Sequence, residues 1–168
     1  MNDPSKISNP RDDLTLEHLK NIPFPTISLP NQEGNLLRLD RFDTFRLVIF
    51  FFSKTGRPDK PLPNNWNNTP DARGCTLLNC TFRDKYDQII SENAIPIGIS
   101  TQSIDDNKEM ASRLSIPFDI LSDENQEIKN LLNLPVFSIS SKNYLKKLLL
   151  IIEKNIIKKV FYPIYPID

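Results

Sequence analysis

The stretches FRLVIFFF (residues 45–52) and AIPIGIS (residues 94–100) decide the fold. Each is a short, almost wholly apolar run, which is typical of a strand covered on both faces of a sheet. The residues between them end in a segment, 75–92, whose apolar side chains recur at helical spacing: Leu78, Phe82, Tyr86, Ile89 and Ile90. A strand, a helix and a strand in this order predict a crossover unit with parallel strands and a helix packed on the sheet.

The regions on either side extend this pattern. Upstream, residues 24–39 alternate around turn residues and predict a small β-hairpin. Downstream we predict a helix, a strand, a helix and an antiparallel hairpin, in residues 105–114, 117–121, 122–132 and 148–161. The expected fold class is α/β, with a central mixed sheet flanked by helices.

The length of 168 residues suits one globular domain, and the chain shows no internal repeat. We expect an N-terminal tail over residues 1–22 and a folded domain over residues 23–168, with a long loop at 53–74. The N-terminal residues hold no apolar core of a signal peptide, and no run of about eighteen apolar residues occurs. The expected location is therefore the cytoplasm, with no membrane partner.

Composition excludes several classes of function. Lys and Arg number 21, as do Asp and Glu, so the formal net charge is zero, which argues against sequence-independent binding to nucleic acid. One His and two Cys exclude a site of several His ligands, and a closed Cys/His zinc site would need added carboxylates. Two cysteines in a reducing compartment are more often catalytic or redox-active than a static disulfide.

The loop at residues 53–74 is rich in Pro and Asn and has no periodicity. Long structureless loops are uncommon inside compact domains and are often functional. The loop ends directly before Cys75. Its Trp66 either forms a lid or docking patch or anchors the loop against the body of the domain, and we favour the anchor.

Cys75 stands where the loop becomes a helix. A thiol there faces free backbone N–H groups and the positive end of the helix dipole, and Arg73 adds a cation, so the thiolate is favoured. Cys80 follows five residues later, which on a regular helix separates the two Cα atoms by about 8.7 Å. Because a disulfide needs them within about 7 Å, the helix start must unwind before these cysteines can bond. The plain alternative is a helix that happens to contain two buried cysteines.

Residues 73–84, RGCTLLNCTFRD, resemble the active-site segment of the peroxiredoxins, in particular the Q-type group named after bacterioferritin comigratory protein. Its P-G-C-T-x-x-x-C-x-F-R-D pattern is matched at Gly74, Cys75, Thr76, Cys80, Phe82, Arg83 and Asp84. Weaker matches at 24–34, 97–103 and 117–123 follow in the family's order, so the resemblance covers about residues 24–161.

The resemblance implies a thioredoxin-like fold and a thiol-dependent peroxidase. Cys75 would be the peroxidatic cysteine, whose thiolate attacks hydrogen peroxide or an organic hydroperoxide and becomes a sulfenic acid. Cys80 would be the resolving cysteine that forms an intramolecular disulfide with it. Thioredoxin or a similar dithiol would reduce that bond. The resemblance implies no metal or organic cofactor, and a resolving cysteine in the same chain fits a monomer.

The chain departs from the family at several positions. Ala72 stands where the family has a peroxide-contacting Thr, which leaves Thr69 as the nearest upstream hydroxyl. Ser53 replaces a Pro that follows the first core strand, and Lys147 replaces a distant Arg, keeping its charge but losing its planar fork. The candidate residues that bind substrate or stabilise the thiolate are therefore Arg73, Thr69, Thr76 and Lys147. The loop resembles a bacterial subgroup with a TGRP…LP…W…ARGCT run, matched here between residues 55 and 76.

Two rival functions stay open. Ala72 and Lys147 remove two peroxide-contacting groups, which suits a thiol–disulfide switch with little turnover. The Pro- and Asn-rich loop with Trp66 suits a non-catalytic binding module on the same fold.

Overall fold

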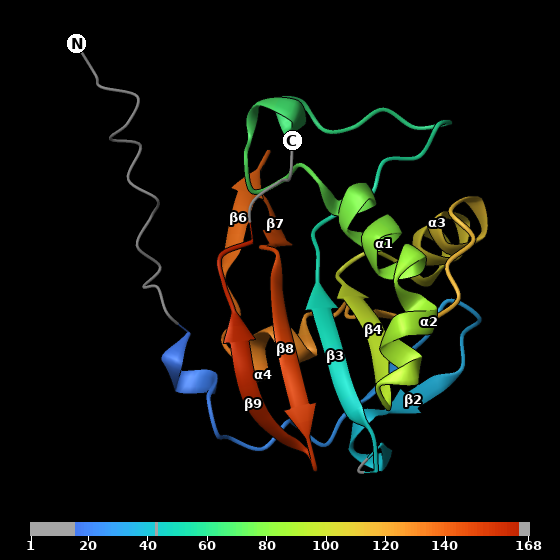
Figure 1. The fold of residues 1–168 in the computed structure, drawn as a ribbon. Coiled ribbons are helices and arrows are strands. Elements are labelled where there is room, and N and C mark those ends of the chain that lie inside the picture. The colour runs from blue at the N-terminus through green and yellow to red at the C-terminus, as the bar shows by residue number, and fades with distance from the viewer. Residues whose placement is uncertain (1–15, 43, 165–168) are drawn as a thin grey trace.

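The computed structural model describes residues 16–42 and 44–164. Its centre is a five-stranded sheet in the order β5-β4-β3-β8-β9 (Figure 1). The strands are β3 (Arg46–Phe51), β4 (Ala94–Ser100), β5 (Ile120–Ser122), β8 (Leu148–Glu153) and β9 (Ile156–Phe161). Strand β4 runs parallel to β3 and β5, whereas β8 runs antiparallel to β3 and β9. The predicted mixed α/β sheet with a closing antiparallel hairpin is confirmed.

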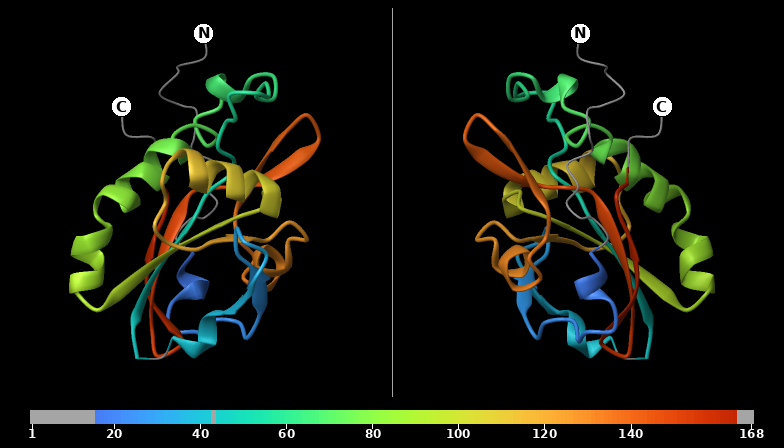
Figure 2. Two further views of the ribbon diagram at one scale, coloured as in Figure 1. Left: turned by 90° about the vertical axis from the view of Figure 1, so that its right-hand side faces the viewer. Right: turned by 90° about the vertical axis from the view of Figure 1, so that its left-hand side faces the viewer.

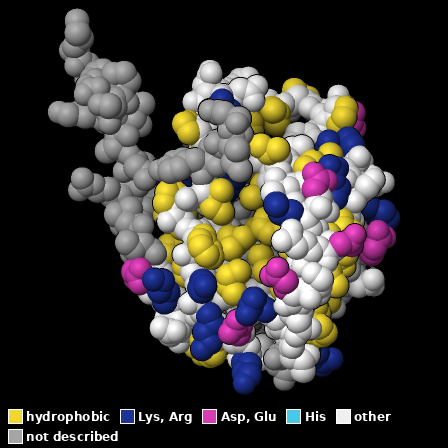
Figure 3. All heavy atoms as spheres, viewed as in Figure 1, with side chains coloured by type: hydrophobic (Ala, Val, Ile, Leu, Met, Phe, Trp, Pro, Cys, Tyr) yellow, Lys and Arg dark blue, Asp and Glu magenta, His cyan; other side chains and the backbone are white. Residues whose placement is uncertain are grey.

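Helices cover both faces of this sheet (Figure 2). Helices α1 (Cys75–Asp84) and α2 (Tyr86–Ser91) lie on one face, and α3 (Ile104–Arg113) joins them beside β5. The opposite face carries α4 (Glu127–Leu131) and the N-terminal part of the chain. The helix cover stops short of β8 and β9, where apolar side chains gather on the surface (Figure 3).

Two predicted helices differ from the structure. The single helix expected over 75–92 is divided at Lys85, whose backbone (φ −99°, ψ 6°) leaves the helical conformation. The helix expected over 122–132 begins only at Glu127. The Asp123 carboxylate accepts the N–H groups of Ile128 and Lys129 at 3.1 and 3.0 Å, so a side-chain-capped turn replaces the first helical turn.

Two small hairpins complete the elements. β1 (Ser28–Pro30) and β2 (Leu36–Arg38) form the antiparallel hairpin expected within residues 24–39. β6 (Val136–Ile139) and β7 (Lys142–Leu145) form a second hairpin that the sequence analysis missed. Its turn residues, Ser140 and Ser141, both have positive φ.

Residues 16–22, which the sequence analysis placed in the N-terminal tail, belong to the packed structure. Leu19 is fully buried and Leu16 nearly so, and both join the cluster beneath the sheet. The N–H of Asn21 donates to the carbonyl of Ile157 on β9. Residues 16–22 therefore belong to the folded domain, and residues 1–15 of the expected tail lie outside the described residues.

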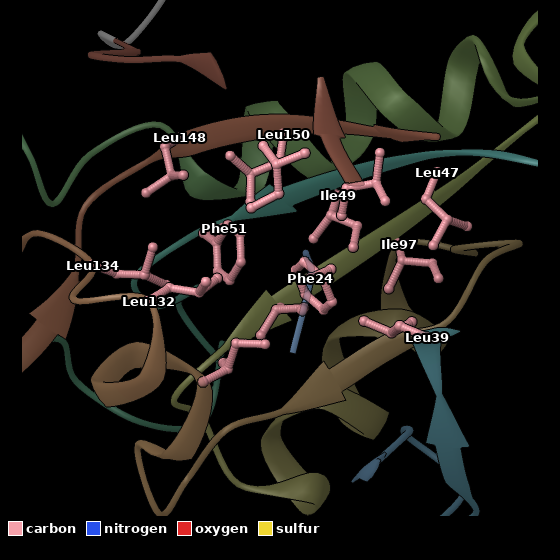
Figure 4. Packing of buried hydrophobic residues seen from close by; sticks show 14 of the residues in the cluster. Phe24, Leu39, Leu47, Ile49, Phe51, Ile97, Leu132, Leu134, Leu148 and Leu150 are labelled. Atoms are coloured by element: carbon pink, nitrogen blue, oxygen red, sulfur yellow. The ribbon is translucent and has the colours of Figure 1, made fainter. Parts of the chain in front are cut away.

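Strand β3 separates two halves of the core by the alternation of its side chains. Leu47, Ile49 and Phe51 face the cluster formed with β8, α4 and the N-terminal segment (Figure 4). Phe50 and Phe52 face α1 and α3 instead. The Phe50 ring occupies the space where a Cβ at Gly98 would stand, since its Cζ lies 2.9 Å from that position. Glycine on β4 thus lets the ring approach the strand closely.

Candidate active site

Cys75 is the first residue of α1 and is buried, with 2% of its surface exposed. Gly74 precedes it with φ 89°, a conformation that side chains other than glycine rarely adopt, and this turn sets the helix start beside the sheet. The sulfur therefore lies where the dipole and the free N–H groups of α1 favour a negative charge.

Three groups surround the Cys75 sulfur. The Ser53 N–H donates to Sγ at 3.4 Å, and the Ser53 hydroxyl lies 3.0 Å from Sγ. The Ala72 carbonyl oxygen lies 3.8 Å from Sγ on the loop side. Two of the three can donate hydrogen bonds to the sulfur, so the pocket suits a thiolate.

Cys80 lies on the same helix, half-buried, and both cysteines are free thiols. The two line one cavity of about 500 Å³ between α1 and the loop, together with Arg73 and Thr76. The structure thus brings together four of the six predicted site residues. Because both cysteines stand in one regular helix, a bond between them requires α1 to unwind at its start.

Lys147 is buried and stands directly before β8. Its Nζ donates to the carbonyl oxygen of Asp71 at 2.7 Å, four residues before Cys75. Burial lowers the pKa of Lys147, against the attraction of Cys75 and Asp71. The side chain is therefore electrostatically coupled to the sulfur while it also fixes the end of the loop.

Thr69 is not brought into this cavity. Its hydroxyl donates to the carbonyl of Asn65 at 2.9 Å, across the short 3-10 turn η4 (Trp66–Asn68). The loop closes on itself there, and Thr69 is not among the residues that line the cavity, although its neighbours Asn67 and Ala72 are.

The loop is held against the missed hairpin. Trp66 is buried and packs edge-on against Tyr144 of β7, with ring centroids 5.0 Å apart, and against Phe137 of β6 at 5.9 Å. Lys146 adds an ion pair with Asp71 at 3.7 Å. Trp66 therefore anchors the loop, as favoured above.

Sequence reasoning missed Ser53 as a site residue. Its replacement of the family Pro was visible, but its contact with Cys75 joins two residues 22 positions apart. Among the described residues, no group of three or more His, Cys, Asp or Glu side chains is placed to hold a metal ion.

The model of the AhpC/TSA family matches residues 21–160. Chloroplastic peroxiredoxin Q of Sedum lineare is 31% identical over 100 residues, and peroxiredoxin Bcp of Escherichia coli K12 is 29% identical over 100 residues. Each match covers 60% of this chain, and 46% and 54% of those proteins respectively. The chain thus spans about half the length of the curated relatives it matches.

Solved structures share the fold. BcpB of Mycobacterium tuberculosis superposes with a TM-score of 0.68 at 20% identity, covering 84% of both chains. The bacterioferritin comigratory protein of Xanthomonas campestris gives a TM-score of 0.68 at 14% identity, covering 89% of this chain and 88% of its own. The thioredoxin-like fold and the resemblance to Q-type peroxiredoxins are confirmed. Because the family model covers most of the chain, this protein belongs to the AhpC/TSA family.

Proposed function

We propose that this protein is a thiol-dependent peroxidase in which Cys75 reacts with the peroxide. The observation that carries the proposal is the buried Cys75 sulfur at the start of α1, facing the Ser53 donors and opening to a cavity shared with Cys80. A thiolate held at a helix start with hydrogen-bond donors is the form of cysteine that attacks an O–O bond.

The first step forms one bond and breaks one. The Cys75 thiolate attacks a peroxide oxygen, the S–O bond forms, the O–O bond breaks, and the departing oxygen takes a proton and leaves as water or an alcohol. The cationic groups near this charge transfer are Arg73, which lines the cavity, and Lys147, which is coupled to the sulfur. Thr76 adds a hydroxyl to the cavity wall.

The second step forms the disulfide. The Cys80 thiol attacks the sulfenic acid, the S–S bond forms, and water leaves. The start of α1 unwinds for this step, because the helix separates the two Cα atoms by about 8.7 Å. A dithiol such as thioredoxin then restores both thiols by exchange, which suits a reducing compartment such as the cytoplasm. Since both cysteines belong to one chain, a monomer suffices.

The substrate class is hydrogen peroxide or an organic hydroperoxide. The Xanthomonas campestris relative has alkyl peroxide reduction activity. The cavity of this chain is bounded partly by the apolar side chains of Leu62 and Leu77, which suits an alkyl group as well as a small peroxide.

A slow redox switch is the second candidate, and one observation favours it. Lys147, at the position of the family's Arg, gives a hydrogen bond to the loop carbonyl of Asp71. A cation engaged in this way has less freedom to polarise a peroxide. The binding-module alternative is weakened, because Trp66 is only 4% exposed and is engaged by Tyr144.

The test is a thiol count by mass spectrometry after one equivalent of hydrogen peroxide, without reductant. We expect rapid loss of two hydrogens, located in a bond between Cys75 and Cys80. Cys75→Ser abolishes peroxide consumption, whereas Cys80→Ser reacts once and then stalls or overoxidises. Turnover retained in Cys75→Ser would reject the proposed nucleophile, and fast oxidation without steady turnover would favour the switch.

A further inference from the structure

Ser53 stands where the chain leaves the sheet. It lies two residues beyond the end of β3, and the preceding residue, Phe52, gives its N–H to the Ile99 carbonyl of β4. The Ser53 N–H turns away from the sheet toward the sulfur of Cys75. The residue is fully buried, so bulk water does not compete for its two donors.

The hydroxyl of Ser53 has two possible acceptors. Its Oγ lies 3.0 Å from Cys75 Sγ and 3.5 Å from the Ala72 carbonyl oxygen. A hydroxyl carries one proton, so it donates to one acceptor at a time. When Cys75 is a neutral thiol, the Ser53 hydroxyl can donate to the Ala72 carbonyl oxygen. With a thiolate, the negative sulfur is the stronger acceptor and draws the proton toward itself.

We propose that Ser53 is a catalytic residue that donates both its N–H and its hydroxyl proton to the Cys75 thiolate, and so keeps the nucleophile charged and aimed at the cavity. The proposal rests on the proposed function of Cys75. A proline, which the family pattern places here, would supply neither donor. Ser53 thus adds polar contacts to a site in which Ala72 has removed a hydroxyl.

Burial strengthens these contacts. In a low-dielectric setting a hydrogen bond to a charged acceptor gains strength, and such bonds are about twice as strong as neutral ones. Removal of the hydroxyl leaves the N–H contact at 3.4 Å as the weaker of the two Ser53 contacts. The thiolate therefore loses its shorter Ser53 contact in Ser53→Ala.

The test uses the Cys80→Ser background, in which Cys75 is the only cysteine of the chain. Thiolate absorbance in the ultraviolet is followed against pH, together with the rates of alkylation by iodoacetamide and of oxidation by hydrogen peroxide. In Ser53→Ala we expect the midpoint of thiolate formation to move to higher pH and the peroxide rate at neutral pH to fall roughly tenfold.

Ser100→Ala is the matched control. Ser100 is also fully buried, at the end of the neighbouring strand β4, but its hydroxyl donates to Asn107. This variant loses a buried hydroxyl while the thiolate midpoint stays where it is. A second pair of variants, Ser53→Thr and Ser53→Val, tests the hydroxyl if Ser53→Ala does not fold. Their side chains have nearly the same volume and differ only in a hydroxyl against a methyl group. Only Ser53→Thr is expected to keep the midpoint of the unaltered protein.

Equal midpoints in Ser53→Ala and Ser100→Ala, or in the Thr and Val variants, would overturn the proposal. Failure of this proposal can be told apart from failure of the proposed peroxidase function. If the unaltered protein does not consume peroxide, the peroxidase proposal fails, while the ionisation and alkylation measurements still decide whether Ser53 supports the thiolate.

Discussion

Strand β3 and the loop at residues 53–74 meet at Cys75, but they are held in different ways. The strand is buried by continuous apolar packing: Phe50 stacks on Phe82 with ring centroids 4.3 Å apart and meets Phe118 edge-on at 5.7 Å. The loop depends on a few separate anchors, chiefly the Trp66 ring and the contacts of Asp71 with Lys146 and Lys147.

Because they are held differently, the strand and the loop have different roles at the active site. The strand leads directly into Ser53, which contacts the sulfur, whereas the far end of the loop brings the Ala72 carbonyl oxygen to the same sulfur. Packing that involves many contacts opens only with the whole domain, but a segment with few anchors can open locally. Near Cys75, the side formed by β3 is therefore rigid, whereas the side formed by the loop can open when α1 unwinds.

Phe50→Ala tests the rigid packing of β3 and has the largest expected effect. The change removes a fully buried ring that joins β3 to α1, and we expect a loss of about 3–5 kcal/mol in the free energy of unfolding. Urea unfolding followed by circular dichroism measures it. Phe45→Ala, at a side chain that is 40% exposed, is the control and should cost under about 1 kcal/mol. Equal losses of unfolding free energy in the two variants would show that β3 is not held by its buried packing.

Trp66→Ala tests the main anchor of the loop at residues 53–74. The ring is buried against Tyr144, but its loss can be absorbed by local opening, so we expect a smaller global cost of about 1–2 kcal/mol. Amide hydrogen exchange within residues 53–74 should accelerate strongly, while that of β3 changes little. Trp66→Phe keeps an aromatic ring and should restore most of the protection. Exchange that accelerates equally in β3 would show that the loop and the strand open together.

The sequence was informative where local pattern determines structure. The strands β3 and β4 and the closing hairpin follow from local runs of apolar residues. Cys75, Cys80, Arg73 and Thr76 could be proposed together as site residues because they are neighbours along the chain, and they line one cavity. Lys147 was reached only through the family resemblance.

The misses come from contacts between distant residues. The β6–β7 hairpin turns at Ser140 and Ser141 rather than at an Asn-Gly pair, so no strong turn signal marks it. Its aromatic rings pack on Trp66, which lies about seventy positions away. No local pattern in the sequence indicates this contact between the hairpin and the loop. Thr69 is a separate case, because its hydroxyl donates to the carbonyl of Asn65 only four residues earlier, across the turn η4.

Asp71→Asn tests a single anchor of the loop. The change removes the carboxylate that pairs with Lys146 at 3.7 Å but keeps the backbone carbonyl that accepts from Lys147. We expect a loss of about 1 kcal/mol or less, because the ion pair is long and Asp71 is partly exposed. Asp84→Asn is the control, since Asp84 is exposed at the end of α1 and pairs with its neighbour Arg83. A much larger loss in Asp71→Asn would mean that one ion pair holds the loop.

Lys147 gives the smallest effect, which appears only as a dependence of stability on pH. Burial lowers the pKa of its side chain in the folded protein, whereas the unfolded chain restores the ordinary value near 10.5. Between these two values the unfolded chain binds more protons, so this group makes the free energy of unfolding rise with pH. Lys147→Met has no such group, and Lys147→Arg stays charged throughout. In urea unfolding from neutral pH up to 10.5, the stability of the unaltered protein relative to either variant should therefore increase with pH. A constant difference would mean that Lys147 keeps an ordinary pKa, and that the closed end of the loop admits water to this side chain.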